Sequence, residues 1–532
     1  MPSPNSEQQV WWKRAVFYEI APVSFQDSNG DGKGDLRGLI DRIPYITWLG
    51  VDAVWLTPIY RSPFHDFGYD ISDFCSIDPS YGSLEEFDEL LARFHAEGIR
   101  VILDFVSNHT SIEHPWFKQS RASRENSKRD WYVWADPAPE GGPPNNWLSR
   151  FGGSAWEWDE ARAQYYYHAF LKEQPDLNWR NQAVRDAMAE VLRFWLNRGV
   201  DGFRVDASAV LIEDDLLRDD PPDPAANVKT PPPSRLKRVF TDDRPGSMTC
   251  IEDIRQVVDE FPGRVLLGEV QGSLGRIGNF YHGARPRLQL PLNYILANTA
   301  WDAHSVQAAI DSYFNTIPAD AWPDWAIGGH DKKRVASHIG QAQARNLALL
   351  LMTLRGTPIF FAGDELGMDR ARIPPDCMKD PFGKQVPGYG LSRDPERVPI
   401  AWKPGLHGGF TTGAPWLPME PNRQPNVETL QAQPRSILHL YRCLMALRRK
   451  TPQLTGGDQI PMRAANDILM YKRADAEAVI LIALNLVDQP RRISLPLRGE
   501  LLLSTHDLMP AKKWQAPLIL RANEGIVARL ER

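Results

Sequence analysis

The sequence predicts an α/β fold: a (β/α)8 TIM barrel with an inserted subdomain after strand 3 and a C-terminal antiparallel β-domain. One observation is that short apolar runs of strand length alternate with segments of helical periodicity over most of the chain. Another is that three of these runs close on a carboxylate, at Asp206, Glu269 and Asp331. Active sites of parallel barrels lie at the carboxyl ends of the strands, so these acids are predicted to face one site.

The eight expected strands come from apolar runs spread along the chain. Residues 84–94 and 188–196 between them place apolar side chains at helical spacing, and Pro44 is expected to start or kink a helix. The expected strands cover residues 15–20, 51–56, 100–104, 201–207, 265–269, 288–294, 325–331 and 358–361. This count, with helices in alternation, indicates a closed barrel.

The alternation breaks twice, and the breaks set the expected domain boundaries. Between Phe105 and Asp176 the sequence is rich in Trp, Gly and Pro without a sustained period, which predicts an inserted subdomain. From about Gln453, short alternating runs predict a small antiparallel, sandwich-like β-domain. The expected parts are the barrel (domain A) in 1–104 and 176–452, the insertion (domain B) in 105–175 and the C-terminal domain (domain C) in 453–532.

Composition narrows the classes of partner. The 532 residues carry 61 Lys and Arg against 67 Asp and Glu, a formal net charge of −6, which gives no basic field for nucleic acid or anionic lipid. The 18 Trp suit stacking on sugar rings, although most are expected in packing. Four scattered Cys are expected as free thiols. A polar N-terminus and the lack of long apolar runs predict a cytoplasmic protein without a membrane partner, and the oligomeric state stays open.

A loop rich in Pro and charge, from Asp219 to Pro233, follows the run that ends at Asp206. Its composition argues against regular structure and fits either a disordered spacer or a rim over the entrance to the site. Both interpretations stay open, and the position after a barrel strand supports the rim.

Carboxylates paired at a barrel mouth, with Arg and His nearby, suit a reaction that uses one ionised and one protonated acid. Glycoside hydrolysis is such a reaction. Any one of these acids alone would more often be a structural ion-pair partner, so the set of three carries the interpretation.

Four segments together resemble the conserved regions of the α-amylase superfamily (glycoside hydrolase family 13). They are Asp104–His109, Gly202–Asp206, Gly268–Val270 and His330–Asp331, in matching order and spacing, and the likeness extends over nearly the whole chain. Residues 174–178 and 27–35 look like the branch that holds the α-glucosidases and oligo-1,6-glucosidases.

The resemblance implies that Asp206 is the nucleophile, Glu269 the general acid and base, and Asp331 the transition-state stabiliser. Arg204 would then keep Asp206 ionised while Glu269 holds a proton, with the two carboxyl groups about 5 to 5.5 Å apart. An Asp-Arg pair would grip the non-reducing end and close the pocket, which means exo-action. The substrate-binding residues implied by the resemblance are Asp66, Tyr69, His109, Arg204, His330 and Arg393.

The segment 27–35 spaces oxygen donors at every second residue, with Gly at its turns, as calcium loops do. It lacks the Glu at position 12 of an EF-hand and could be only a turn. The resemblance implies a structural Ca²⁺ site, with Mg²⁺ possible, whose ligands are Asp27, Asn29, Asp31, the Lys33 carbonyl and Asp35.

As a whole the resemblance implies a retaining exo-acting α-glucosidase that releases α-glucose from short α-glucosides through a covalent glucosyl-enzyme. Ala207 after the nucleophile favours α-1,4 linkages, whereas Gly329 departs from the Asn common before the His-Asp pair. An α-glucosyltransferase, or a sucrose- or trehalose-type disaccharide hydrolase, would use the same residues. A non-catalytic glycan-binding or transporter-partner barrel is more remote, since all three acids are present.

Overall fold

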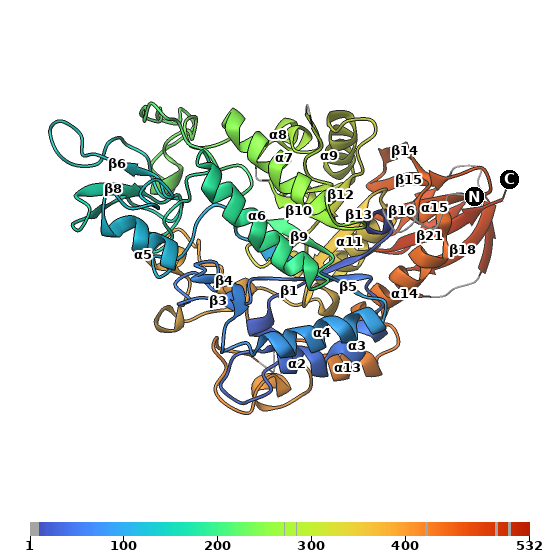
Figure 1. Ribbon diagram of the computed structural model, residues 1–532. Coiled ribbons are helices and arrows are strands. Elements are labelled where there is room, and N and C mark those ends of the chain that lie inside the picture. The colour runs from blue at the N-terminus through green and yellow to red at the C-terminus, as the bar shows by residue number, and fades with distance from the viewer. Residues whose placement is uncertain are drawn as a thin grey trace.

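A parallel eight-stranded barrel forms the centre of the protein, as the computed structural model shows (Figure 1). The structure describes residues 10–270, 272–283, 285–420, 424–494, 498–508, 512–515 and 517–531. In Figure 1 an inserted three-stranded sheet lies at one end of the molecule, on the left, and the C-terminal sheets lie at the other, on the right.

The barrel strands occur where the sequence predicts them, in the spatial order β11-β10-β9-β5-β2-β1-β13-β12 with every neighbouring pair parallel. A backbone hydrogen bond of 3.0 Å from Ala326 to Asn293 joins the last strand to the first. The strands are β1 (Phe17–Ile20), β2 (Ala53–Leu56), β5 (Arg100–Phe105), β9 (Gly202–Val205), β10 (Val265–Glu269), β11 (Leu290–Leu292), β12 (Asp324–Ala326) and β13 (Thr357–Phe361).

Several predicted strands are shorter than expected, and two of them shorten most. The run 325–331 is a strand only to Ala326, and His330 and Asp331 lie in the turn that follows it. The run 288–294 narrows to Leu290–Leu292. Consecutive glycines at 328 and 329 favour a turn over further pairing, so Asp331 reaches the barrel mouth from a loop.

Helices surround the barrel because each has one apolar face. The helix α4 begins at a capping box, in which Ser83 accepts from the Glu86 backbone and Glu86 accepts from the Ser83 backbone. Pro44 lies in the first turn of α3, as predicted. The helices are α2 (Leu36–Asp41), α3 (Ile43–Leu49), α4 (Leu84–Ala96), α6 (Gln182–Asn197), α7 (Pro245–Asp259), α8 (Leu274–Asn279), α9 (Ala303–Thr316), α10 (Val335–Ile339), α11 (Gln341–Thr353), α12 (Pro381–Gln385), α13 (Val427–Ala432), α14 (Ile437–Lys450) and α15 (Pro452–Thr455).

The insertion after β5 holds α5 (Pro115–Ala122) and the antiparallel strands β6 (Trp134–Ala135), β7 (Trp156–Asp159) and β8 (Gln164–Tyr167). A short hairpin of β3 (Tyr60–Arg61) and β4 (Asp73–Ile77) precedes it. The Pro-rich loop packs against the insertion: Asn146 exchanges hydrogen bonds with Asp220, and Trp147 donates to the Arg218 carbonyl at 2.8 Å. These contacts make the loop an ordered wall.

The C-terminal part is antiparallel, as predicted. Its strands are β14 (Asp458–Ala465), β15 (Ile468–Ala474), β16 (Val479–Asn485), β17 (Arg491–Ile493), β18 (Arg498–Ser504), β19 (Lys512–Gln515), β20 (Leu518–Leu520) and β21 (Gly525–Leu530). Buried Arg473 ties this sheet to the barrel by donating to the carbonyls of Thr353, Leu454 and Gly457. The four Cys are free thiols. No helix in the described residues combines the length and apolarity needed to cross a bilayer.

Three buried histidines make the insertion sensitive to acid. Burial lowers the pKa of His109, His114 and His168 to about 4. In the unfolded chain the same imidazoles bind a proton near pH 6.5, so between about pH 6.5 and 4 the unfolded state binds more protons than the folded state. The free energy of unfolding therefore falls as the pH falls through this range, by up to about 1.4 kcal/mol per pH unit for each histidine. We expect His168→Gln to flatten the pH dependence of hydrogen exchange in residues 105–175.

The matched control is His304→Gln, which changes an exposed histidine on α9 and should leave the pH dependence as it is. Buried Asp176 and Glu213 act in the opposite direction, because burial raises the pKa of both, to about 7 for Glu213. The difference between variants therefore isolates the imidazole contribution. Equal slopes for the two variants would contradict the prediction.

Candidate active site

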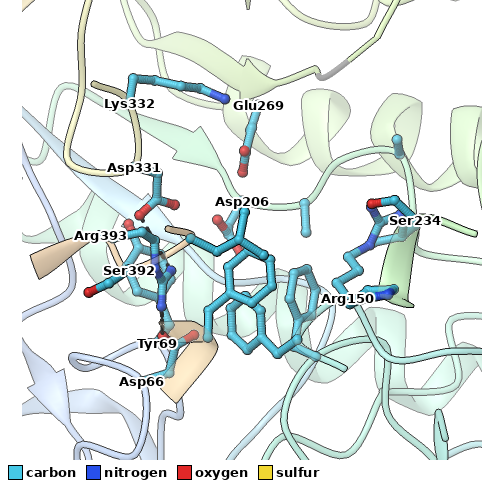
Figure 2. Close-up of a pocket in the computed structure, with 18 of the residues that line it drawn as sticks. Asp66, Tyr69, Arg150, Asp206, Ser234, Glu269, Asp331, Lys332, Ser392 and Arg393 are labelled. Atoms are coloured by element: carbon cyan, nitrogen blue, oxygen red, sulfur yellow. Dashed lines mark hydrogen bonds and ion pairs between the residues drawn. The ribbon is translucent and has the colours of Figure 1, made fainter. Parts of the chain in front are cut away.

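Asp206 and Glu269 stand next to each other at the carboxyl ends of neighbouring strands. Asp206 follows β9 and donates its backbone N–H to the Phe105 carbonyl at 3.0 Å, and Glu269 is the last residue of β10. Ala207 takes a left-handed backbone conformation (φ 48°), which turns the chain sharply after Asp206. Both carboxyl groups face the same pocket (Figure 2).

One guanidinium joins three carboxylates at the base of this pocket. Arg204, 2% exposed, donates from Nη1 to Asp206 at 2.6 Å and to Asp104 at 2.8 Å, and from Nη2 to Glu269 at 2.7 Å. The β5–β9 register sets Asp104 beside Arg204, so the three acids come from three adjacent strands. The predicted separation of the Asp206 and Glu269 carboxyl groups stays a prediction.

The cluster carries more negative charge than Arg204 can neutralise. Burial raises the pKa of Asp206 well above its usual range, and Glu269, Asp104 and Asp331 add to the rise while Arg204 opposes it. Arg204 favours the ionised form of Asp206, as expected, but the same cation serves three acids. Burial and the neighbouring carboxylates favour the protonated form, so the two effects oppose each other at Asp206.

Asp331 has the opposite environment. Its carboxylate accepts from Arg397 and lies 3.4 Å from Arg393 Nη1 and 3.5 Å from His330 Nε2. Burial alone would raise its pKa, but His330, Arg393 and Arg397 together hold the pKa of Asp331 well below its usual range. Asp331 is thus a fixed negative charge facing the pair.

The pocket is closed at one end by an ion pair between segments far apart in the chain. Arg393 Nη2 contacts Asp66 at 2.7 Å and Asp380 at 2.8 Å. Gln174 extends the barrier by donating to Asp66 at 3.1 Å and lies 3.0 Å from His109 Nε2. Figure 2 shows Asp66, Tyr69 and Arg393 grouped on one side of Asp206.

The pocket is a cavity of about 430 Å³, and it contains most of the residues predicted from the sequence. Arg204 and His330 do not line it, since both are buried behind the acids: His330 Nε2 lies 2.8 Å from Tyr69 Oη, which donates to Asp104 at 2.8 Å. The predicted residues that line the cavity are Asp66, Tyr69, His109, Asp206, Glu269, Asp331 and Arg393.

Sequence reasoning missed two groups of residues. One is the part of the wall made by the inserted subdomain and by the segment after the Pro-rich loop, which includes Arg150, Phe151 and Arg238. Nothing local in the sequence marks these side chains, because only tertiary packing brings them together. The presence of Pro233 in the lining agrees with the rim interpretation of the Pro-rich loop.

The other missed residue is Glu19, the third residue of β1. It is fully buried, and its Oε1 accepts from the His330 ring and, at 3.2 Å, from the His330 backbone. Its Oε2 has no hydrogen-bond partner among the described residues, and a Cβ at Gly329 would come within 3.1 Å of it. The available signal was a carboxylate inside an otherwise apolar strand, which differs from the acid at a strand end that identified Asp206.

The loop 27–35 is held by its own oxygens. Asp27 accepts from the backbone of Asn29, Gly30 and Gly32, and Asp35 accepts from Ser28. These oxygen donors fit calcium in type, and a carboxylate has lone pairs left after such contacts. Within the described residues, no group of three or more His, Cys, Asp or Glu is arranged to hold a metal ion.

The parallel barrel presents a pair of carboxylates bridged by Arg204, with a third acid facing them in the same pocket. This arrangement is typical of a glycoside hydrolase. Comparison specifies the family. Residues 19–457 match the family described as "Alpha amylase, catalytic domain", and the chain belongs to this family.

Similar proteins carry several activities. The chain is 40% identical over 508 residues to a probable alpha-glucosidase of Rhizobium meliloti (strain 1021), covering 92% of this chain and 91% of that one. It is also 35% identical over 547 residues to a human (Homo sapiens) amino acid transporter heavy chain, covering 97% and 78%.

Solved structures of similar proteins agree in fold. The alpha-glucosyl transfer enzyme XgtA superposes with a TM-score of 0.91 at 39% identity, covering 98% of this chain and 99% of that one. The trehalulose synthase MutB from Pseudomonas mesoacidophila MX-45 superposes with a TM-score of 0.90 at 33% identity, covering 98% and 99%.

The position of Glu19 predicts an effect on rate. Replacing Glu19 by Gln keeps the shape but removes the negative charge behind His330, so His330 and the adjacent Asp331 lose their fixed arrangement. We expect kcat on a glucoside to fall on the order of tenfold, equivalent to about 1.4 kcal/mol. Steady-state kinetics and thermal unfolding measure the effect.

The matched control is Glu365→Gln, another fully buried acid, which contacts Tyr18 and Tyr45 rather than the pocket. It should lower the unfolding temperature with little change in kcat. If both variants lost kcat equally, the loss would reflect general destabilisation and the positioning role of Glu19 would be wrong.

Proposed function

We propose that this chain is a retaining, exo-acting α-glucosidase that releases α-glucose from the non-reducing end of short α-glucosides, with α-1,4 linkages favoured. The observation that carries the proposal is the Arg204-bridged pair, Asp206 and Glu269, in a pocket closed by Asp66 and Arg393. A relative named as a probable alpha-glucosidase supports it.

The proposed reaction has two steps. Glu269 donates its proton to the glycosidic oxygen as the bond from C1 to that oxygen breaks, and an Asp206 oxygen forms an ester bond to C1. Water then attacks C1 as Glu269 takes its proton, and the bond to Asp206 breaks. The fixed charge of Asp331 stabilises the positive charge that develops on the sugar ring in both steps.

The closed end of the pocket supports exo-action. The Asp66 and Arg393 side chains, joined at 2.7 Å, leave no passage for further sugar units beyond the ring that contacts Tyr69. Their charges favour hydrogen bonds to hydroxyl groups at the non-reducing end. Ala207 beside Asp206 supports the α-1,4 preference through its small side chain.

Glucosyl transfer is the second candidate, because a sugar hydroxyl competes with water for the same glucosyl-enzyme. The similarity to XgtA and MutB favours it. A non-catalytic role is less well supported despite the transporter heavy chain among the relatives, since Asp206, Glu269 and Asp331 all line the pocket.

We expect the enzyme to hydrolyse maltose and 4-nitrophenyl α-glucoside with α-glucose as the first product. NMR measures the anomeric configuration of the glucose that is released. Initial rates on isomaltose, sucrose and trehalose, compared with maltose, define the preferred linkage. If oligosaccharides are the main products at high sugar concentration, glucosyl transfer is favoured. Asp206→Ala should lower kcat by a factor on the order of 10⁴ or more, because it removes the nucleophile.

The control for this variant is Asp223→Ala, a half-buried acid of the Pro-rich loop that does not line the pocket. Retained activity in Asp206→Ala, or β-glucose as the first product, would contradict the assigned roles.

We also propose that the loop 27–35 binds Ca²⁺ through Asp27, Asn29, Asp31, the Lys33 carbonyl and Asp35. The spacing and type of these oxygen donors support the proposal. The ion would fix the loop after β1 and take no part in bond breaking.

Chelation tests this site. At a Ca²⁺ concentration of 100 times the dissociation constant, binding would add about 2.7 kcal/mol of stability, so EDTA should lower the unfolding temperature and Ca²⁺ should restore it. The exposed Asp31 allows a clean variant, Asp31→Ala, which should abolish this response. An unfolding temperature unaffected by EDTA would remove the calcium proposal.

A further inference from the structure

The pocket wall opposite the closed end is basic. Figure 2 shows Arg150 and Ser234 across the pocket from Asp66 and Arg393, with Asp206 between the two sides. In the proposed reaction the sugar ring lies at the closed end, so the opposite wall faces the leaving group. We call it the aglycone wall. Its cationic residues are Arg150, Arg238 and Arg276, whereas Lys332, which also lines the cavity, lies beside Asp331 and Glu269 (Figure 2).

These cations come from separate parts of the chain. Arg150 belongs to the inserted subdomain, Arg238 to the segment after the Pro-rich loop, and Arg276 to α8. A basic surface helix would cluster such residues by sequence alone. Here the fold itself collects them on one side of one cavity.

Acids on this wall compensate only part of the positive charge. Asp242 pairs with Arg150 and lies 3.3 Å from Arg276, which also contacts Asp243 at 2.6 Å. Asp242 and Asp243 therefore stand against three guanidinium groups. The excess is positive in a partly buried site, where an anion is worth more than at the surface.

Arg238 is the least compensated of the three guanidinium groups. Among the described residues it donates to the carbonyls of Leu148, at 2.7 Å, and Pro233, at 3.0 Å, and to no carboxylate. Burial, together with the repulsion of Arg150, lowers the pKa of Arg238 to about 10. A second anion beside Arg238 would relieve this repulsion.

Aromatic rings connect this wall to the closed end, because the Arg150 guanidinium lies 5.9 Å from the Phe170 ring centroid and the Arg393 guanidinium lies 4.9 Å from that of Phe151. Phe151 stacks on Phe382 with ring centroids 5.1 Å apart and meets Phe170 edge to face at 5.7 Å. All three rings line the cavity. An apolar surface beside a cationic cluster fits a small leaving group with a flat or short carbon frame and one acidic substituent.

We propose that the aglycone wall selects α-glucosides whose leaving group carries a carboxylate or a phosphate. The inference rests on the proposed glucosidase function and specifies its substrate class. A neutral leaving group would leave the excess positive charge unpaired and partly desolvated, whereas an acidic group pairs with it through charge-assisted hydrogen bonds.

Matched substrates test the inference. The 4-(carboxymethyl)phenyl and 4-(carbamoylmethyl)phenyl α-glucosides differ in charge at nearly constant shape, and maltose with a phosphate on the reducing-end glucose is compared with maltose. We expect kcat/KM to be at least tenfold higher for the charged member, mostly through KM, and the ratio to shrink as salt rises. The larger of the two ratios identifies carboxylate or phosphate as the preferred group.

Arg238→Gln should lower the ratio of charged to neutral substrate severalfold. The control is Arg235→Gln, which changes an exposed neighbour that does not line the pocket and should keep the native ratio. Ratios near one for both substrate pairs in the native enzyme, with the neutral glucosides turned over, would overturn this inference and leave the glucosidase function standing. No turnover of any glucoside would overturn both.

Discussion

The buried guanidinium of Arg204 is the interaction on which the site depends. A cation with 2% exposure needs carboxylates to offset its desolvation, and it obtains them from β5, the end of β9 and β10. The register of the strands therefore also sets the positions of the acids. A slip of one residue in β9 would turn Arg204 away from Asp104, and it would move Asp206 out of the cluster. The same strand pairing that forms the barrel therefore also brings the site residues together.

This arrangement separates two kinds of carboxylate. Asp206 and Glu269 share one cation with Asp104, and burial together with the neighbouring carboxylates raises the pKa of Asp206. Asp331 instead has Arg397, Arg393 and His330 around it, which lower its pKa. The pKa values of Asp206 and Asp331 are therefore shifted in opposite directions, because the ratio of cations to acids differs on the two sides of the pocket.

The sequence predicts what depends on local pattern. Each barrel strand is an apolar run, and Asp206 and Glu269 are found because an acid ends such a run. Glu19 lies inside its run, where only the presence of a charge in an apolar strand marks it. The extent of the strand before Asp331 was wrong because the glycines at 328 and 329 turn the chain early. Arg238 could not be predicted as a pocket residue, since its place depends on how the Pro-rich loop packs against the insertion.

The arginines at the two ends of the pocket have different numbers of carboxylate partners, and this difference explains their different roles. Arg393 is paired with both Asp66 and Asp380, so it acts through the direction of its hydrogen bonds and suits neutral hydroxyl groups. Arg238 donates to carbonyls and to no carboxylate among the described residues, so its charge is left for a ligand. Loops form both ends of the pocket, whereas Asp206 and Glu269 stand at the ends of barrel strands. Loops tolerate change more readily than barrel strands, so the leaving-group preference can change while the bond-breaking residues stay in place.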